Sequence, residues 1–100
     1  MEITISDVAE KERFEARDAE GELAGFVTYQ LTGNIIVYTH TQTEPSHQGQ
    51  GVAGQLARFV MDDARTRGRT VVPICPYIAE WIGKHPEYAD SVAHNTKKVK

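Results

Sequence analysis

The stretch Gln48-Gly49-Gln50-Gly51-Val52-Ala53-Gly54 decides the fold of this chain. It follows a β-branched run and opens a segment whose apolar residues recur at helical spacing. A glycine-rich turn at the start of a helix leaves backbone N–H groups unpaired at the positive end of the helix dipole. Because glycine has no Cβ, a ligand can approach that backbone closely. The stretch therefore predicts an anion site, with phosphate as its usual occupant.

Three β-rich runs precede this turn. They cover residues 13–17, 22–31 and 34–41, where β-branched and aromatic residues cluster or alternate with polar ones. The connections between them, Asp18-Ala19-Glu20-Gly21 and Thr32-Gly33-Asn34, are short enough for hairpins. The three runs are therefore expected to form an antiparallel meander.

The pattern changes after the turn. Apolar residues recur every three or four positions from 52 to 67, which predicts a helix with one buried stripe. Residues 70–75 are a second β-branched run, so the strands on either side of this helix should be parallel in a βαβ crossover. Pro73 cannot donate a ladder hydrogen bond, which predicts an edge, a bulge or a splayed partner at the end of that strand. Two short helical segments, 77–84 and 87–92, are expected to close the fold.

Length and composition place the chain among small globular domains. With 100 residues it has room for one core, so we expect a single α/β domain of the α+β kind over residues 1–100, with its core at about 13–92. A net charge of −3 argues against capture of nucleic acid. No signal peptide and no apolar run of about 20 residues is present, which predicts a cytoplasmic protein without a membrane span.

The cysteine and histidine content predicts neither a disulfide nor a metal site. Cys75 is alone, so it has no partner within the chain. Neither an H-x-x-H nor a C-x-x-C spacing occurs, so we expect no bound metal.

The glycine turn can be interpreted in more than one way. Gly49-Gln50-Gly51-Val52-Ala53-Gly54 matches the dinucleotide fingerprint G-x-G-x-x-G. That reading needs an acidic residue about 20 positions later, whereas Val71-Val72-Pro73-Ile74-Cys75-Pro76 contains none. In a second interpretation the glycines only make a tight turn, although three of them among glutamines exceed what a tight turn needs.

The same residues fit the pattern Gln/Arg-x-x-Gly-x-Gly/Ala. This pattern resembles the acetyl-CoA pyrophosphate loop of the GNAT N-acetyltransferase superfamily. Together with His40-Thr41, Val71-Val72-Pro73-Ile74-Cys75-Pro76 and His85-Pro86-Glu87-Tyr88-Ala89, it resembles the small single-domain GNAT-like family of about 100 residues. Three separated motifs in the right order make this resemblance specific.

The resemblance implies how acetyl-CoA would bind. In that superfamily the pantetheine arm lies between two splayed parallel strands, and the pyrophosphate rests on the amides of the loop. By similarity, the backbone at Thr43 would meet the pantetheine amide. The residues around the phosphates would be Gln48, Gly49, Gln50, Gly51, Val52, Ala53 and Gly54.

The resemblance also implies two catalytic residues. His40 and Cys75 end the two splayed strands, and both are expected to point toward the cleft mouth. Histidine can accept a proton near neutral pH, and a Cys75 thiolate whose pKa is lowered by a nearby His40 could take the acetyl group first. Where the small family usually carries a glutamate two residues after the histidine, this chain has Gln42, which cannot act as a general base.

Two function hypotheses follow. The first is a minimal acetyl-CoA-dependent N-acetyltransferase that acts on an amine of a protein or of a small molecule such as a polyamine. The second, favoured by Gln42 and by the short segment before the first predicted strand, is a non-catalytic domain that binds CoA or acyl-CoA. A domain with no ligand is the third possibility.

Overall fold

The β-rich half of the chain forms four strands in the computed structural model, which describes residues 2–93. These are β1 (Thr4–Val8), β2 (Arg13–Arg17), β3 (Leu23–Thr32) and β4 (Ile35–Thr43). Each pairs antiparallel with the next, and the sheet order is β1-β2-β3-β4-β5. The predicted meander is therefore confirmed, with one strand more than expected.

The additional strand is β1. The sequence pattern predicts a first strand at Arg13, whereas β1 pairs along the whole of β2, from Thr4 opposite Arg17 to Val8 opposite Arg13. Its residues alternate between half-buried and exposed, with Ile3 and Ile5 packed against the core. This alternation of apolar and polar residues is the signal that would have revealed the strand.

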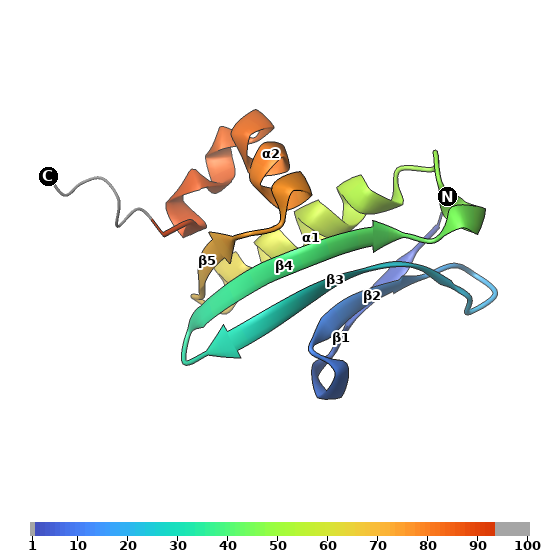
Figure 1. Ribbon diagram of the computed structural model, residues 1–100, viewed down its shortest axis with the longest axis horizontal. Coiled ribbons are helices and arrows are strands. Elements are labelled where there is room, and N and C mark those ends of the chain that lie inside the picture. Colours follow the sequence, from blue (N-terminus) through green and yellow to red (C-terminus); the bar gives the residue numbers. More distant parts are fainter. Residues whose placement is uncertain (1, 94–100) are drawn as a thin grey trace, which may run out of the picture.

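The glycine turn leads into helix α1 (Val52–Thr66), which is followed by β5 (Thr70–Pro73). Strand β5 pairs in parallel with β4, from Ile35 opposite Thr70 to Tyr38 opposite Pro73, so the predicted βαβ crossover is confirmed. Helix α2 (Pro76–Lys84) and the 3-10 helix η3 (Pro86–Ser91) complete the described fold. Figure 1 shows α1 running behind β4, with no described helix in front of β2, β3 and β4.

One face of the sheet packs on α1 and forms the core. Phe14 of β2 packs edge-on against Phe59 of α1, with ring centroids 6.0 Å apart. The hydroxyl of Tyr38 on β4 donates a hydrogen bond of 2.6 Å to the carbonyl of Val60. Buried apolar side chains such as these supply most of the stability, at about 1.5–3 kcal/mol for each fully buried residue.

Gly25 allows the start of α1 to approach the sheet. A Cβ at this position would lie 2.7 Å from the carbonyl oxygen of Gln42 and 3.0 Å from a methyl carbon of Val52. Real Cβ atoms do not come so close to backbone, so only glycine fits without a shift. The close approach sets the first turn of α1 beside the end of β4.

The opposite face of the sheet, here called the outer face, carries the side chains of Arg13, Glu15, Phe26, Thr28 and His40. Side chains alternate along a strand, so the neighbours of the core residue Phe14 must point away from α1. Ring and ion-pair contacts join these residues to one another, which confirms that they share one face.

Within the described residues, no helix is long and apolar enough to cross a bilayer.

Candidate functional site

The glycine turn has the backbone conformation that only glycine adopts readily. Gly49 has φ +80° and Gly51, the N-cap of α1, has φ +78°. No side chain caps the helix, and Gln55 is the first residue whose N–H bonds back to the turn, at 3.1 Å from the Gly51 carbonyl. The amides of the first turn therefore lack acceptors within the helix and remain free for an anion.

A cavity of about 350 Å³ opens at this helix end. Tyr77 of α2 forms its far wall, and a Cβ on Gly54 would lie 3.8 Å from the Tyr77 hydroxyl. All the residues expected to bind the cofactor line the cavity except Gln50. The lining set is Thr43, Gln48, Gly49, Gly51, Val52, Ala53, Gly54 and Tyr77.

The two parallel strands diverge beside this cavity. Their ladder ends where Tyr38 faces Pro73, while β4 continues to Thr43. One more hydrogen bond, from the Cys75 amide to the Tyr38 carbonyl at 2.9 Å, marks the apex of the separation. Pro73 is therefore followed by a splay, one of the three arrangements predicted for it, and the backbone of β4 beyond the apex has no partner in β5.

Cys75 lies at this apex, where β5 passes into α2. Its side chain is 2% exposed, and its Sγ lies 3.2 Å from the hydroxyl of Thr41 on β4. This contact places the thiol on the side of the sheet that packs on α1, lining the inner end of the splay. Within residues 2–93, no basic side chain is in contact with the sulfur.

His40 lies on the outer face instead, because β4 contains a β-bulge. Thr28 pairs with His40 while the next residue, Tyr29, pairs with Tyr38, so Thr39 is an extra residue. A bulge reverses the alternation of side chains beyond it. The hydroxyls of Thr39 and Thr28 are 2.6 Å apart and brace this irregularity.

The expectation that His40 and Cys75 point toward one cleft mouth is therefore corrected. They lie on opposite faces of β4, since Thr41 contacts Cys75 and its neighbour His40 points the other way. The exposed imidazole lies 3.4 Å, through Nε2, from Oε1 of Gln42, and its ring centroid is 6.3 Å from that of Phe26. A bulge is set by pairing register, so the spacing along the sequence did not reveal it.

Two tyrosines of the C-terminal segments, Tyr77 and Tyr88, occupy different surroundings. Tyr77 is 39% exposed at the cavity wall, and burial of its hydroxyl raises the pKa of its phenol above the ordinary value of 10.0. Tyr88 is buried and donates a hydrogen bond of 2.6 Å to Asp62, so it belongs to the packing of η3 on α1. Only Tyr77 lies where it can meet a ligand of the glycine turn.

A buried histidine ties the glycine turn to the β2–β3 hairpin. His47, at the end of the 3-10 helix η2 (Pro45–His47), is 5% exposed. Its Nε2 lies 2.8 Å from Asp18 Oδ2, and its Nδ1 lies 2.8 Å from the Ser46 hydroxyl. Asp18 also accepts hydrogen bonds from the amides of Glu20 and Glu22, so its carboxylate is fixed within the turn of the β2–β3 hairpin. We call the His47–Asp18 pair the loop clamp; sequence reasoning missed it because its partners are 29 residues apart.

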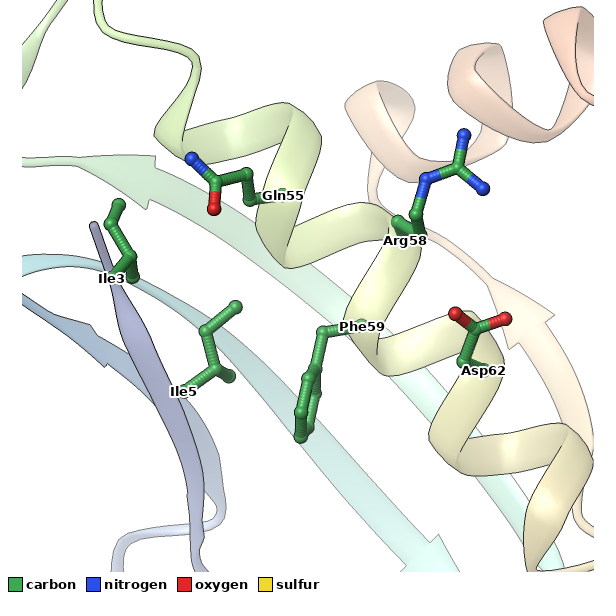
Figure 2. A pocket seen from close by; sticks show the side chains of 6 residues that line it. All are labelled: Ile3, Ile5, Gln55, Arg58, Phe59 and Asp62. Atoms are coloured by element: carbon green, nitrogen blue, oxygen red, sulfur yellow. The ribbon is translucent and has the colours of Figure 1, made fainter. Parts of the chain in front are cut away.

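A second cavity, of about 320 Å³, lies between β1 and the middle of α1 (Figure 2). Ile3 and Ile5 border it on one side, and Gln55, Arg58, Phe59 and Asp62 of α1 border it on the other. None of the predicted site residues lies in it. Among the described residues, no group of three or more His, Cys, Asp or Glu side chains could hold a metal ion.

Comparison with solved structures supports the fold. The alignment with a GCN5-like protein from Staphylococcus aureus covers 97% of this chain and 96% of that protein, with a TM-score of 0.66 and 24% sequence identity. The alignment with a GNAT family N-acetyltransferase from Escherichia coli, solved in complex with CoA, covers 61% of this chain and 38% of that protein, with a TM-score of 0.52 and 25% identity. The predicted α/β fold class is confirmed by these likenesses.

Comparison of sequences points the same way. Streptothricin acetyltransferase of Streptomyces lavendulae is 36% identical over 62 residues, which are 60% of this chain and 33% of that protein. The chain thus spans about a third of the length of this curated relative. The family model described as GCN5-related N-acetyltransferase matches residues 13–91. Because that match takes in β2 to η3, including the glycine turn and both diverging strands, this chain belongs to the GCN5-related N-acetyltransferase family.

Proposed function

We propose that this chain is an acetyl-CoA-dependent N-acetyltransferase. One observation carries the proposal: the free amides at the head of α1 open into a cavity that adjoins the splay of β4 from β5. The free amides suit a pyrophosphate, and the splay between the strands suits an extended arm that carries amide groups. The family and the CoA complex of the E. coli relative support the same ligand.

The residues present fit coenzyme A. Gly49, Gly51 and the amides from Val52 to Gly54 would hold the pyrophosphate, because the two positive φ values turn the backbone toward the cavity. Thr43, which ends β4 where that strand has no partner in β5, would pair with the pantetheine arm. Bound acetyl-CoA would supply the thioester that donates the acetyl group.

His40 would act as the general base. It is exposed on the outer face and lies on the same strand as Thr43, which lines the cavity. An amine that approaches from the outer face therefore meets the imidazole first. With Nε2–H donating to Gln42 Oε1, Nδ1 would remain available to accept the proton of the amine. Gln42 would thus orient the imidazole, a role that requires no negative charge.

Cys75 would line the acyl end of the site and would not be the nucleophile. The sulfur is buried and contacts the Thr41 hydroxyl, while the base lies on the other face of β4. A thiol without a contacting base is a poor nucleophile. Direct attack by the amine therefore agrees better with this geometry than a cysteine intermediate.

Titration calorimetry with CoA and transfer assays with radiolabelled acetyl-CoA would test the proposal. We expect binding in the micromolar range, transfer to amines, a loss of transfer of about 10²–10⁴-fold in His40→Ala, and a loss of less than about tenfold in Cys75→Ala. Absence of CoA binding at millimolar ligand would overturn the proposal. Binding without transfer to any amine would support the non-catalytic alternative, and acetyl label trapped on Cys75 would restore the covalent route.

A further inference from the structure

The outer face of the sheet is a second surface with an organised set of side chains. Its centre is Phe26 on β3, with the Arg13 guanidinium 4.5 Å from the ring centroid on one side and the His40 ring on the other. The strand register places Arg13, Thr28 and His40 in one row across β2, β3 and β4. An aromatic platform therefore separates a fixed cation from the proposed base.

The arginines on this face are held in place by a buried carboxylate. Glu15 is 3% exposed, and its two oxygens accept separate bonds, from Arg13 at 2.7 Å and from Arg17 at 2.9 Å. Arg17 also donates to the Gly21 carbonyl at 3.0 Å. Within residues 2–93, Arg13 Nη1 has no hydrogen-bond partner, so this rigidly held guanidinium keeps a donor for a ligand.

The charge on this face is opposite to that of the protein. The whole chain has a net charge of −3. The charged side chains of the five strands are Asp7, Arg13, Glu15 and Arg17. Asp7 lies among the core-facing side chains, where it accepts a bond from the Tyr29 hydroxyl at 2.6 Å. The outer face therefore carries two guanidinium groups against one carboxylate, a balance that attracts an anion and repels a polycation.

We propose that the outer face is the acceptor site and that it selects a small amine that also bears a carboxylate. This inference rests on the proposed function, because it uses His40 as the base. The amine would meet His40, the methylene chain would lie on Phe26, and the carboxylate would bind Arg13 Nη1. The Arg13 guanidinium lies 4.5 Å and the His40 ring centroid 6.3 Å from the Phe26 ring centroid, so the two groups are at most about 11 Å apart, a span that suits an ω-amino carboxylate of about five carbons.

The first test is a titration of ¹⁵N-labelled protein with 5-aminopentanoate in the presence of CoA, followed by NMR. We expect amide shifts at Phe26, Thr28 and His40 and none around the second cavity at Ile5. Pentylamine, which has a methyl group in place of the carboxylate, should bind at least about tenfold more weakly. Shifts confined to other surfaces, or equal binding of the two amines, would overturn the inference. Because binding is the readout, this test does not depend on acetyl transfer.

The second test compares acceptors in the transfer assay. The kcat/KM for 5-aminopentanoate should exceed that for pentylamine by about tenfold, and 1,5-diaminopentane should be the poorest of the three. Arg13→Gln should reduce the ratio to about one, whereas Arg67→Gln, which removes a charge at the far end of α1, should leave it unchanged. Wild type that acetylates the three amines equally would overturn the inference while the proposed function stands. Absence of all transfer would count against the proposed function instead.

Discussion

Gly51 both forms the turn into α1 and lies at the edge of the cavity. Its φ of +78° turns the chain into α1, and its position as N-cap puts the free amides of the first helical turn at the edge of the cavity. An L-residue in this conformation costs about 1–2 kcal/mol. The residue that must be glycine for the turn is therefore also the one that presents the free amides to a ligand.

Replacing Gly51 with alanine should weaken CoA binding by about tenfold or more, because the turn must relax away from the left-handed conformation that aims the amides. The measurement is the Kd from calorimetry, with the Tm recorded alongside. Gly33→Ala is the matched control, since it has φ +60° in the β3–β4 hairpin away from the cavity. Equal losses of affinity in both variants would show that general destabilisation, and not the turn, is responsible.

Glu15 makes stability depend on pH. Burial raises the pKa of its carboxyl, but the hydrogen bonds and charges of Arg13 and Arg17 outweigh burial and hold the pKa below its ordinary value of 4.5. A carboxyl whose pKa is lowered by folding stabilises the protein above about 4.5, and this contribution is lost as the pH falls through the lowered folded pKa.

Glu15→Gln should therefore cost about 1–2 kcal/mol at pH 7, because Arg13 and Arg17 remain partly solvated. The difference from wild type should shrink as the pH falls from 5 to 3. Urea denaturation across that range measures both effects, and Glu80→Gln on the exposed face of α2 serves as control. A difference that stays constant down to pH 3 would contradict the assigned linkage.

At the scale of elements, the loop clamp joins the β2–β3 hairpin to η2 and the glycine turn, which lie far from the hairpin in sequence. Asp18 belongs to the β2–β3 hairpin, His47 ends η2, and the glycine turn follows directly. The His47 hydrogen bond holds the pKa of the Asp18 carboxyl below its ordinary value of 3.8. We therefore expect the contact with the hairpin to restrain the glycine turn.

His47→Gln should loosen the turn and raise the Kd for CoA by about five- to tenfold, since part of the binding free energy would be spent on ordering the loop. Hydrogen exchange of the amides from Gly49 to Gly54 should become faster in the free protein. His85→Gln is the matched control, because His85 packs on Trp81 and bonds to its carbonyl at 2.8 Å, outside the cavity. Unchanged exchange in His47→Gln would show that the pair does not restrain the turn.

At the scale of the whole molecule, the sheet separates the two proposed substrate sites. The cavity at the head of α1 lies on the helix side, and the outer face with His40 lies on the other. The splay between β4 and β5 connects the two sides. A ligand in the splay would replace the missing strand contacts and stabilise the native state as a unit.

CoA at 100 times its Kd should therefore stabilise the protein by about 2.7 kcal/mol. For a domain of this size that corresponds to a rise in Tm of about 10–20 °C. Differential scanning fluorimetry with and without CoA measures the shift. Adenosine 5′-monophosphate, which lacks both the pyrophosphate and the pantetheine arm, should give a much smaller one. A Tm unchanged by CoA would favour a domain without this ligand.

The sequence by itself determined the elements and their order. The signals are local: apolar residues alternate before residue 43 and recur at helical spacing after the glycine turn, and Gly68 and Pro76 end elements. The observed strands and helices from β2 to η3 follow these signals. The glycine turn also predicts an anion site, because the positive φ values at Gly49 and Gly51 are a property of the local backbone. Strand β1 could have been found in the same way, from the alternation around Ile5.

Only the tertiary structure decided which side chains meet. The bulge at Thr39 depends on the register between β3 and β4, and it moves His40 to the face opposite Cys75. The pair of His47 with Asp18 depends on a contact across 29 residues. Local periodicity specifies how each segment is built, whereas register and long-range contacts arise when the segments pack together, so the chemistry of this site is set at the second step.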